Sequence, residues 1–230
     1  MIRLKFIRHF RDVLKFNQLP KSDNKICVYC EGKNYWPHLK PIVGQLLKQT
    51  DIQVNYVSSS DDDPGLQLES PNFRSYLIGD GFIRNYFFDN LNSDVVIMTM
   101  PDLDQYQVKK SKHVKQFVYV HHSLVSHHMV YRPKAFDAFD VILCAGPHHN
   151  AEINKMTETW HMPAKKLINH GYGRLDSIIA NSKEKSQNEI KKMHNILLSY
   201  LEAININGNL APLPLFPPLT WTVLDTKLSG

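Results

Sequence analysis

Short apolar runs alternate with amphipathic stretches between residues 25 and 180, and turn-forming residues separate them. Runs of β-branched and aromatic residues predict strands, whereas apolar residues that recur every three or four positions predict helices. A chain that alternates strands and helices forms a parallel sheet with helices on both faces. We therefore expect an α/β, Rossmann-like domain with strands at residues 26–30, 52–57, 76–78, 94–98, 116–120, 140–144 and 167–170.

The N-terminal stretch has a different pattern. Residues 1–16 place apolar and aromatic side chains near one helical stripe and mostly basic side chains opposite it. We interpret residues 1–20 as a basic amphipathic helix and a link. Such a helix can lie on an anionic membrane surface. It can equally dock on its own domain with its charges solvated, and the sequence leaves both possibilities open.

The pattern changes again after residue 190. Residues 204–230 contain few charges, four prolines between Pro212 and Pro218, and no lasting periodicity. We therefore divide the chain into residues 1–20, a Rossmann-like domain at 21–190, and an atypical tail at 191–230. The tail is interpreted as poorly ordered, or as non-native sequence from a truncated or frame-shifted gene.

Charge and composition limit the function classes. The formal net charge is +5, and residues 1–16 alone carry +4, from five basic residues against Asp12. Basic charge concentrated in one segment favours a surface-binding arm over a nucleic-acid partner. Neither a signal-peptide pattern nor an apolar run of about 20 residues is visible. We expect a cytoplasmic protein, with possible peripheral attachment to the inner face of the cell membrane.

Three cysteines make no disulfide framework, which fits a reducing compartment. Cys27 and Cys30 have CxxC spacing but lie in an expected strand. An odd separation along a strand points two side chains to opposite faces. We therefore expect neither a redox pair nor a shared metal from these cysteines.

The strand at 116–120 ends abruptly in His121, His122 and Ser123. Ligands of open α/β sheets bind outside the carboxyl ends of strands, and histidine is the side chain that most readily moves a proton near neutral pH. Three adjacent histidine pairs occur, at 121/122, 127/128 and 148/149. Neighbouring histidines on a strand point to opposite faces, so each pair offers about one ligand. Because HExxH and Cys–His zinc spacings are absent, we expect no metal and no cofactor.

Phosphate-binding turns give a weaker signal. Gly32-Lys33 and Gly79-Asp80-Gly81 lie at strand-to-helix turns, where backbone N–H groups can receive a phosphate. Neither turn is a Walker loop, and GxGxxG is missing. The acidic run Asp61–Asp63 is interpreted as a solvated turn in preference to a cation site.

Six short motifs follow one another along the chain: EGKNYWPH at 31–38, DPGL at 63–66, MTMPDL at 98–103, HSLVS at 122–126, GPHH at 146–149 and GYGRLD at 171–176. In this order they resemble the CDP-glycerol glycerophosphotransferase family, which makes glycerol-phosphate polymers such as teichoic acids. The resemblance covers roughly residues 25–180.

The resemblance implies a GT-B-like protein in which two Rossmann-like domains face each other across a cleft. The N-terminal domain takes the acceptor, and the C-terminal domain binds CDP-glycerol. Residues 21–190 correspond to the acceptor-side domain only, and no second set of strand–helix units follows residue 190. We therefore expect the donor-binding half to be missing and the chain alone to be inactive or nearly so.

The resemblance also implies roles for individual residues. His122 matches a family histidine in a Trp-His-Gly-Thr-like motif and is the expected general base, although Ser123 replaces the glycine. Lys33 and Arg174 are the candidate cations, and either could instead pair with a nearby carboxylate. The full set of expected substrate-binding residues is Gly32, Lys33, Ser123, Ser126, His148, His149 and Arg174.

The implied partners are CDP-glycerol and a glycerol-phosphate or lipid-linked acceptor. Two other functions stay open at this point. One is a GT-B glycosyltransferase or a nucleotide-sugar epimerase, which shares the architecture. The other is a non-catalytic remnant that binds a membrane surface through residues 1–16.

Overall fold

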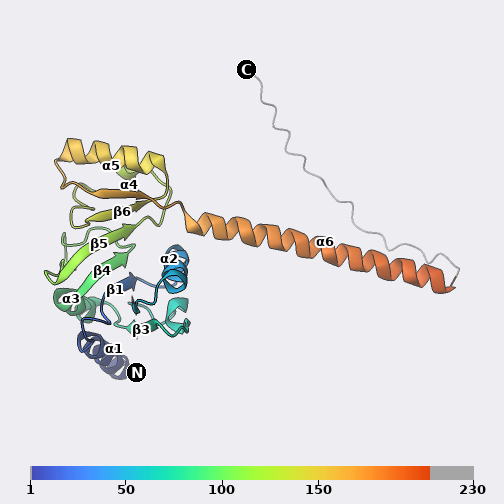
Figure 1. Cartoon of the computed structure of the whole chain (residues 1–230), viewed down its shortest axis with the longest axis horizontal. Helices are drawn as coiled ribbons and strands as arrows, with labels where there is room; N and C mark the ends of the chain where they lie inside the picture. The colour runs from blue at the N-terminus through green and yellow to red at the C-terminus, as the bar shows by residue number, and fades with distance from the viewer. Residues whose placement is uncertain (1, 208–230) are drawn as a thin grey trace, which may run out of the picture. The chain divides into compact units, whose positions relative to one another are not determined.

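The computed structural model describes residues 2–207. Within them, seven strands form one all-parallel sheet in the order β3-β2-β1-β4-β5-β6-β7 (Figure 1). The predicted α/β, Rossmann-like fold class is therefore confirmed. The strands are β1 (Ile26–Cys30), β2 (Val54–Ser58), β3 (Phe73–Leu77), β4 (Ser93–Met98), β5 (Val114–Val120), β6 (Val141–Cys144) and β7 (Lys166–Asn169).

Helices of ten or more residues connect β1 to β2, β3 to β4 and β6 to β7, as the alternating pattern predicts. The other connections differ: a short 3-10 helix lies between β2 and β3, no helix lies between β4 and β5, and only a single helical turn forms between β5 and β6, where residues 121–126 are irregular. β3 also begins earlier than expected, since Phe73 is already buried against the sheet. The helices are α1 (Ile2–Asn17), α2 (Trp36–Gln49), η1 (Pro64–Gln67), α3 (Gly81–Asn90), α4 (His127–Val130), α5 (Pro147–Trp160) and α6 (Gly173–Asn207).

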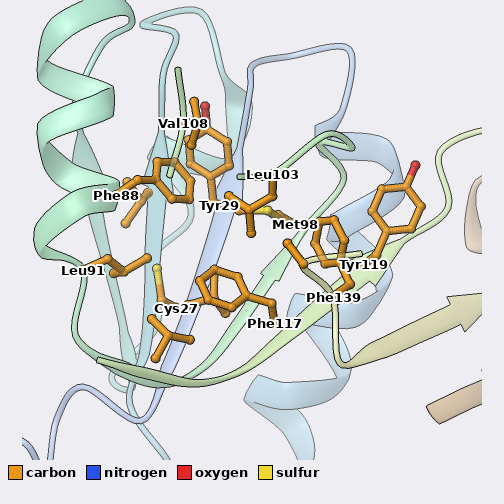
Figure 2. Packing of buried hydrophobic residues seen from close by; sticks show 14 of the residues in the cluster. Cys27, Tyr29, Phe88, Leu91, Met98, Leu103, Val108, Phe117, Tyr119 and Phe139 are labelled. Carbon is orange, nitrogen blue, oxygen red and sulfur yellow. The ribbon is translucent and has the colours of Figure 1, made fainter. Parts of the chain in front are cut away.

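Side chains of the strands alternate between two apolar clusters, one on each face of the sheet. Cys27 belongs to the cluster shared with α1, α3 and α5, and Cys30 belongs to the cluster shared with α2. The expected opposite orientation of the two cysteines is confirmed. Figure 2 shows the first cluster, where the Phe88 ring packs edge-on against Tyr29 with 4.9 Å between ring centroids. Doubly covered strands of this kind are apolar throughout.

Helix α1 docks on the sheet domain through its second half. Val13 and Phe16 are fully buried, and the Asp12 carboxylate accepts a hydrogen bond from the Leu77 amide. The docked alternative therefore holds for this half. Phe6 and Ile7, in the first half, remain 52% and 61% exposed. None of the described helices combines the length and apolar character needed to cross a membrane.

The described residues divide into two units, with the boundary between Ile178 and Ile179. Helix α6 continues through residue 190, where the sequence places a change of character, and ends at Asn207. Its residues 183–203 are rich in lysine, glutamate and leucine, which favour helix. The remainder of the expected tail, residues 208–230, lies outside the described residues.

Candidate functional site

The order of the strands defines where a ligand is expected. The chain runs outward from β1 to β2 and β3, then returns to β4 on the other side of β1. The carboxyl ends of β1 and β4 therefore mark the topological switch point, where open α/β sheets bind ligands. Glu31 directly follows β1, Thr99 directly follows β4, and His121 directly follows β5 at the neighbouring position.

His122 lies at this edge and is half-buried. The Tyr119 hydroxyl lies 3.3 Å from its Nδ1, and the Tyr172 hydroxyl donates a 3.0 Å hydrogen bond to its carbonyl oxygen. The ring packs edge-on against Tyr35 at a centroid distance of 5.5 Å. Burial lowers the pKa of His122, and a hydrogen bond with the backbone of Thr99 opposes this shift. The imidazole is therefore neutral near pH 7, and one ring nitrogen keeps a lone pair.

His38, in the first turn of α2, lies beside His122 with 6.1 Å between ring centroids. Arg174 donates a 3.3 Å hydrogen bond from its guanidinium to Nε2 of His38. Burial, then Arg174, then His122 lower the pKa of His38 to about 4. Since Nε2 accepts a hydrogen bond, the proton of the neutral ring lies on Nδ1.

Three buried polar atoms near the switch point have no hydrogen-bond partner among the described residues. They are Oε2 of Glu31, Nδ1 of His38 and Oγ1 of Thr99. Buried polar groups are nearly always paired, because an unmade hydrogen bond costs about 1–3 kcal/mol. Burial also raises the pKa of Glu31 to about 7, although Arg84 opposes the shift. The edge thus offers an acceptor, a donor and a hydroxyl that a ligand can satisfy.

A second histidine group lies next to this edge. His121, His127 and His149 are all buried, and their ring centroids are 4.3–4.4 Å apart. Each comes from a different one of the three sequence pairs. The carboxylate of Glu152 accepts hydrogen bonds from the backbone N–H of His127 and from the hydroxyl of Ser126. The expected ligands Ser126 and His149 therefore belong to this group.

The other expected substrate-binding residues are spread over several loops. Gly32 has φ +149 after β1, and its carbonyl accepts the Tyr35 amide at 2.9 Å. Lys33 is exposed, with its ammonium 2.7 Å from the Asp62 carboxylate, so the alternative of a local ion pair is confirmed for it. Ser123 is half-buried in the irregular segment, and His148 is exposed with its ring against His149.

The carboxylates of the acidic run Asp61–Asp63 make more ion pairs and hydrogen bonds than a solvated turn would. Asp61 pairs with Lys5, whereas Asp63 is buried and accepts hydrogen bonds from Tyr56 and Ser58, each at 2.7 Å. The Asp63 side chain also accepts from the Gly65 amide and so caps η1. The DPGL motif therefore has a structural role in shaping the loop between β2 and β3.

Sequence reasoning does not single out Glu31, His38, Tyr35 or Tyr172, although all four lie inside motifs at 31–38 and 171–176. The signal that would have found Glu31, Tyr35 and His38 is the switch point, because the segment after β1 borders it in this strand order; Tyr172 follows β7 and lies outside that segment. The strand order is needed to use that signal, and a sequence pattern alone does not fix the order.

The protein-family models include no match to this sequence, and the curated proteins include none either. Among solved structures, the chain is similar to a variant of the wall teichoic acid polymerase TagF that was soaked with CDPG. The TM-score is 0.50 and the identity 12%, over 83% of this chain and 51% of that chain. The chain thus spans about half the length of this polymerase. The likeness is one of fold, and it agrees with the predicted half of a GT-B-like architecture.

Proposed function

We propose that the protein takes part in transfer of glycerol phosphate from CDP-glycerol to a hydroxyl acceptor, with residues 21–190 forming the acceptor side. The observation that carries the proposal is a neutral His122 beside the topological switch point, next to the His38–Arg174 pair. Two further facts support it: the order of the six motifs and the fold likeness to a polymerase soaked with CDPG.

The proposed step is a nucleophilic displacement at phosphorus. The acceptor hydroxyl oxygen bonds to the β-phosphorus of CDP-glycerol, the bond from that phosphorus to the CMP oxygen breaks, and CMP leaves. His122 takes the hydroxyl proton, as a general base with its lone pair near the reacting oxygen does. Negative charge spreads over the phosphoryl oxygens, where Arg174 and the buried N–H of His38 can stabilise it.

Other residues of the edge would position the acceptor in this proposal. Gly32 contributes backbone close to the switch point, and Ser123 contributes a hydroxyl from the segment that carries His122. Lys33, already held by Asp62, and the exposed His148 would act at the rim. Main-chain and hydroxyl donors are common partners of phosphate-bearing ligands.

Under this proposal a second domain binds the donor, as the family resemblance implies. The test joins the chain to the donor-binding half of a teichoic acid polymerase and measures release of the nucleoside monophosphate. CDP-glycerol and a set of nucleotide sugars are offered in parallel, with a glycerol-phosphate oligomer as acceptor. Acceptor-dependent release of CMP from CDP-glycerol supports the proposal. Turnover of a nucleotide sugar instead would favour the glycosyltransferase alternative.

Attachment to an anionic membrane is a second candidate function, which is compatible with the first. The exposed Phe6 and Ile7 lie on α1 among basic residues, an arrangement typical of interfacial helices. Co-sedimentation with anionic vesicles tests it, using Phe6→Ser with Ile7→Ser as the variant. Because Phe82 on α3 is 74% exposed, Phe82→Ser is a matched control. Unchanged sedimentation of the double variant would remove this candidate.

A further inference from the structure

Three elements bring one buried histidine each to a single point. His121 follows β5, His127 begins α4, and His149 lies in the first turn of α5. Their exposed fractions are 4%, 0% and 0%, and one ring nitrogen from each lies within 4.8 Å of the others. Three buried imidazoles so close together need partners for six ring nitrogens, and apolar residues such as Phe136 pack around them.

The distances between the ring nitrogens of His121 and His127 fit a shared metal ion. Nε2 of His127 lies 3.0 Å from Nε2 and 3.3 Å from Nδ1 of His121. Two imidazole nitrogens bound to Zn²⁺ at about 2.0–2.1 Å in tetrahedral geometry are separated by roughly 3.3 Å. His121 has no other hydrogen-bond partner for its ring in the described part of the chain. One hydrogen bond to His127 would therefore leave its second ring nitrogen unsatisfied.

The surrounding hydrogen bonds orient lone pairs inward. Nδ1 of His127 lies 2.9 Å from the Glu152 carboxylate, which can only accept when ionised, so the lone pair of the neutral ring lies on Nε2. Nε2 of His149 lies 3.3 Å from the Val125 carbonyl, another acceptor, so its lone pair lies on Nδ1. The Ala145 amide donates a long hydrogen bond of 3.4 Å to this Nδ1.

Glu152 completes a pattern that metal sites share. A histidine that binds a metal usually donates its other ring N–H to a carboxylate or a backbone carbonyl, which fixes the ring and its tautomer. Glu152 is in this position for His127, and the Val125 carbonyl is in this position for His149. Glu152 also holds the backbone N–H of His127 at 2.6 Å, which fixes the start of α4.

We propose that His121, His127 and His149 bind a divalent transition-metal ion of the Zn²⁺ class, with water as the fourth ligand. Three imidazoles select this class over Mg²⁺ or Ca²⁺, which prefer oxygen ligands. The ion ties together the end of β5, the start of α4 and the start of α5. The ion thereby fixes the conformation of residues 121–127, which include His122. Metal binding at these three histidines does not depend on whether His122 is a general base.

The test uses the full chain without an affinity tag. Metal is removed with a chelator, and Zn²⁺ alone is titrated by calorimetry against a competing chelator; Co²⁺ is then substituted and its visible spectrum recorded. We expect one Zn²⁺ per chain and the intense absorption of tetrahedral Co²⁺. His121→Ala and His149→Ala should each weaken binding at least 100-fold, and Glu152→Gln about 10- to 100-fold.

His113→Ala is the matched control, because His113 is exposed and directly precedes the opposite end of β5. It should bind Zn²⁺ as the wild type does. Circular dichroism checks that each variant folds. If His121→Ala does not fold, the wild-type Co²⁺ spectrum and the Zn²⁺ affinity of Glu152→Gln test the proposal instead. The proposal is overturned by an absence of stoichiometric Zn²⁺ binding in the wild type. It is equally overturned by wild-type affinity in the folded His121→Ala and His149→Ala variants, or by wild-type affinity in Glu152→Gln if His121→Ala does not fold.

Discussion

Arg174 donates a hydrogen bond to Nε2 of His38 across 136 positions of the sequence. The contact joins the start of α6 to the start of α2, beside the carboxyl end of β1. A cation held against a buried imidazole keeps that ring neutral, because both effects disfavour a second positive charge. The pair therefore presents one fixed cation and one neutral ring to the edge that carries His122.

Replacing Arg174 should change the titration of His38. In Arg174→Ala the pKa of His38 should rise above its value of about 4 and remain below 6.5, because burial is the larger cause of the shift. Histidine proton signals followed by NMR over pH 3–8 measure it. Lys155→Ala, which removes an exposed cation on α5 paired with Glu158, is the control and should leave His38 unchanged. A His38 pKa equal in wild type and Arg174→Ala would contradict the contact.

Glu31 should make stability depend on pH. Burial raises its pKa from 4.5 to about 7, so the folded state binds this proton more tightly than the unfolded state. The stabilisation of the folded state by this bound proton is complete below about pH 4.5 and is lost as the pH rises through 7. Over this range the free energy of unfolding falls by about 3 kcal/mol. Chemical unfolding of the wild type and Glu31→Gln at pH 4.5 and pH 8 measures it. The variant should gain stability relative to the wild type at pH 8; parallel profiles would contradict the assignment.

Two phenylalanines of α3 should respond very differently to truncation. Phe88 is fully buried against Tyr29, as Figure 2 shows, whereas Phe82 is 74% exposed. Phe88→Ala should lower the free energy of unfolding by about 3–5 kcal/mol through lost burial and a cavity. Phe82→Ala should change it by less than about 0.5 kcal/mol. Equal losses, measured by denaturant unfolding, would contradict the packing of α3.

The sequence predicts those features that depend on local pattern. The alternation of strands and helices indicates the parallel sheet, and the odd spacing of Cys27 and Cys30 puts them on opposite faces. The position of His122 at a strand end also follows from the local pattern. Each of these follows from residues that are close in sequence.

Features that depend on distant contacts could not be predicted in this way. The pairing of His38 with Arg174 requires the strand order, which no local pattern specifies. The sequence indicates that each histidine pair offers about one ligand. That His121, His127 and His149 meet depends on the irregular backbone after β5 and on Glu152, from α5. The expectation of no metal therefore depended on local spacing alone.

In the proposed reaction His122 accepts the proton of the acceptor hydroxyl. The most direct measurement is acceptor-dependent release of CMP from CDP-glycerol by the chain joined to a donor-binding half, with His122→Ala and His113→Ala compared. Loss of a general base predicts a kcat about 10²- to 10⁴-fold lower for His122→Ala, with His113→Ala unchanged. Full activity in a folded His122→Ala variant would show that His122 is not the general base.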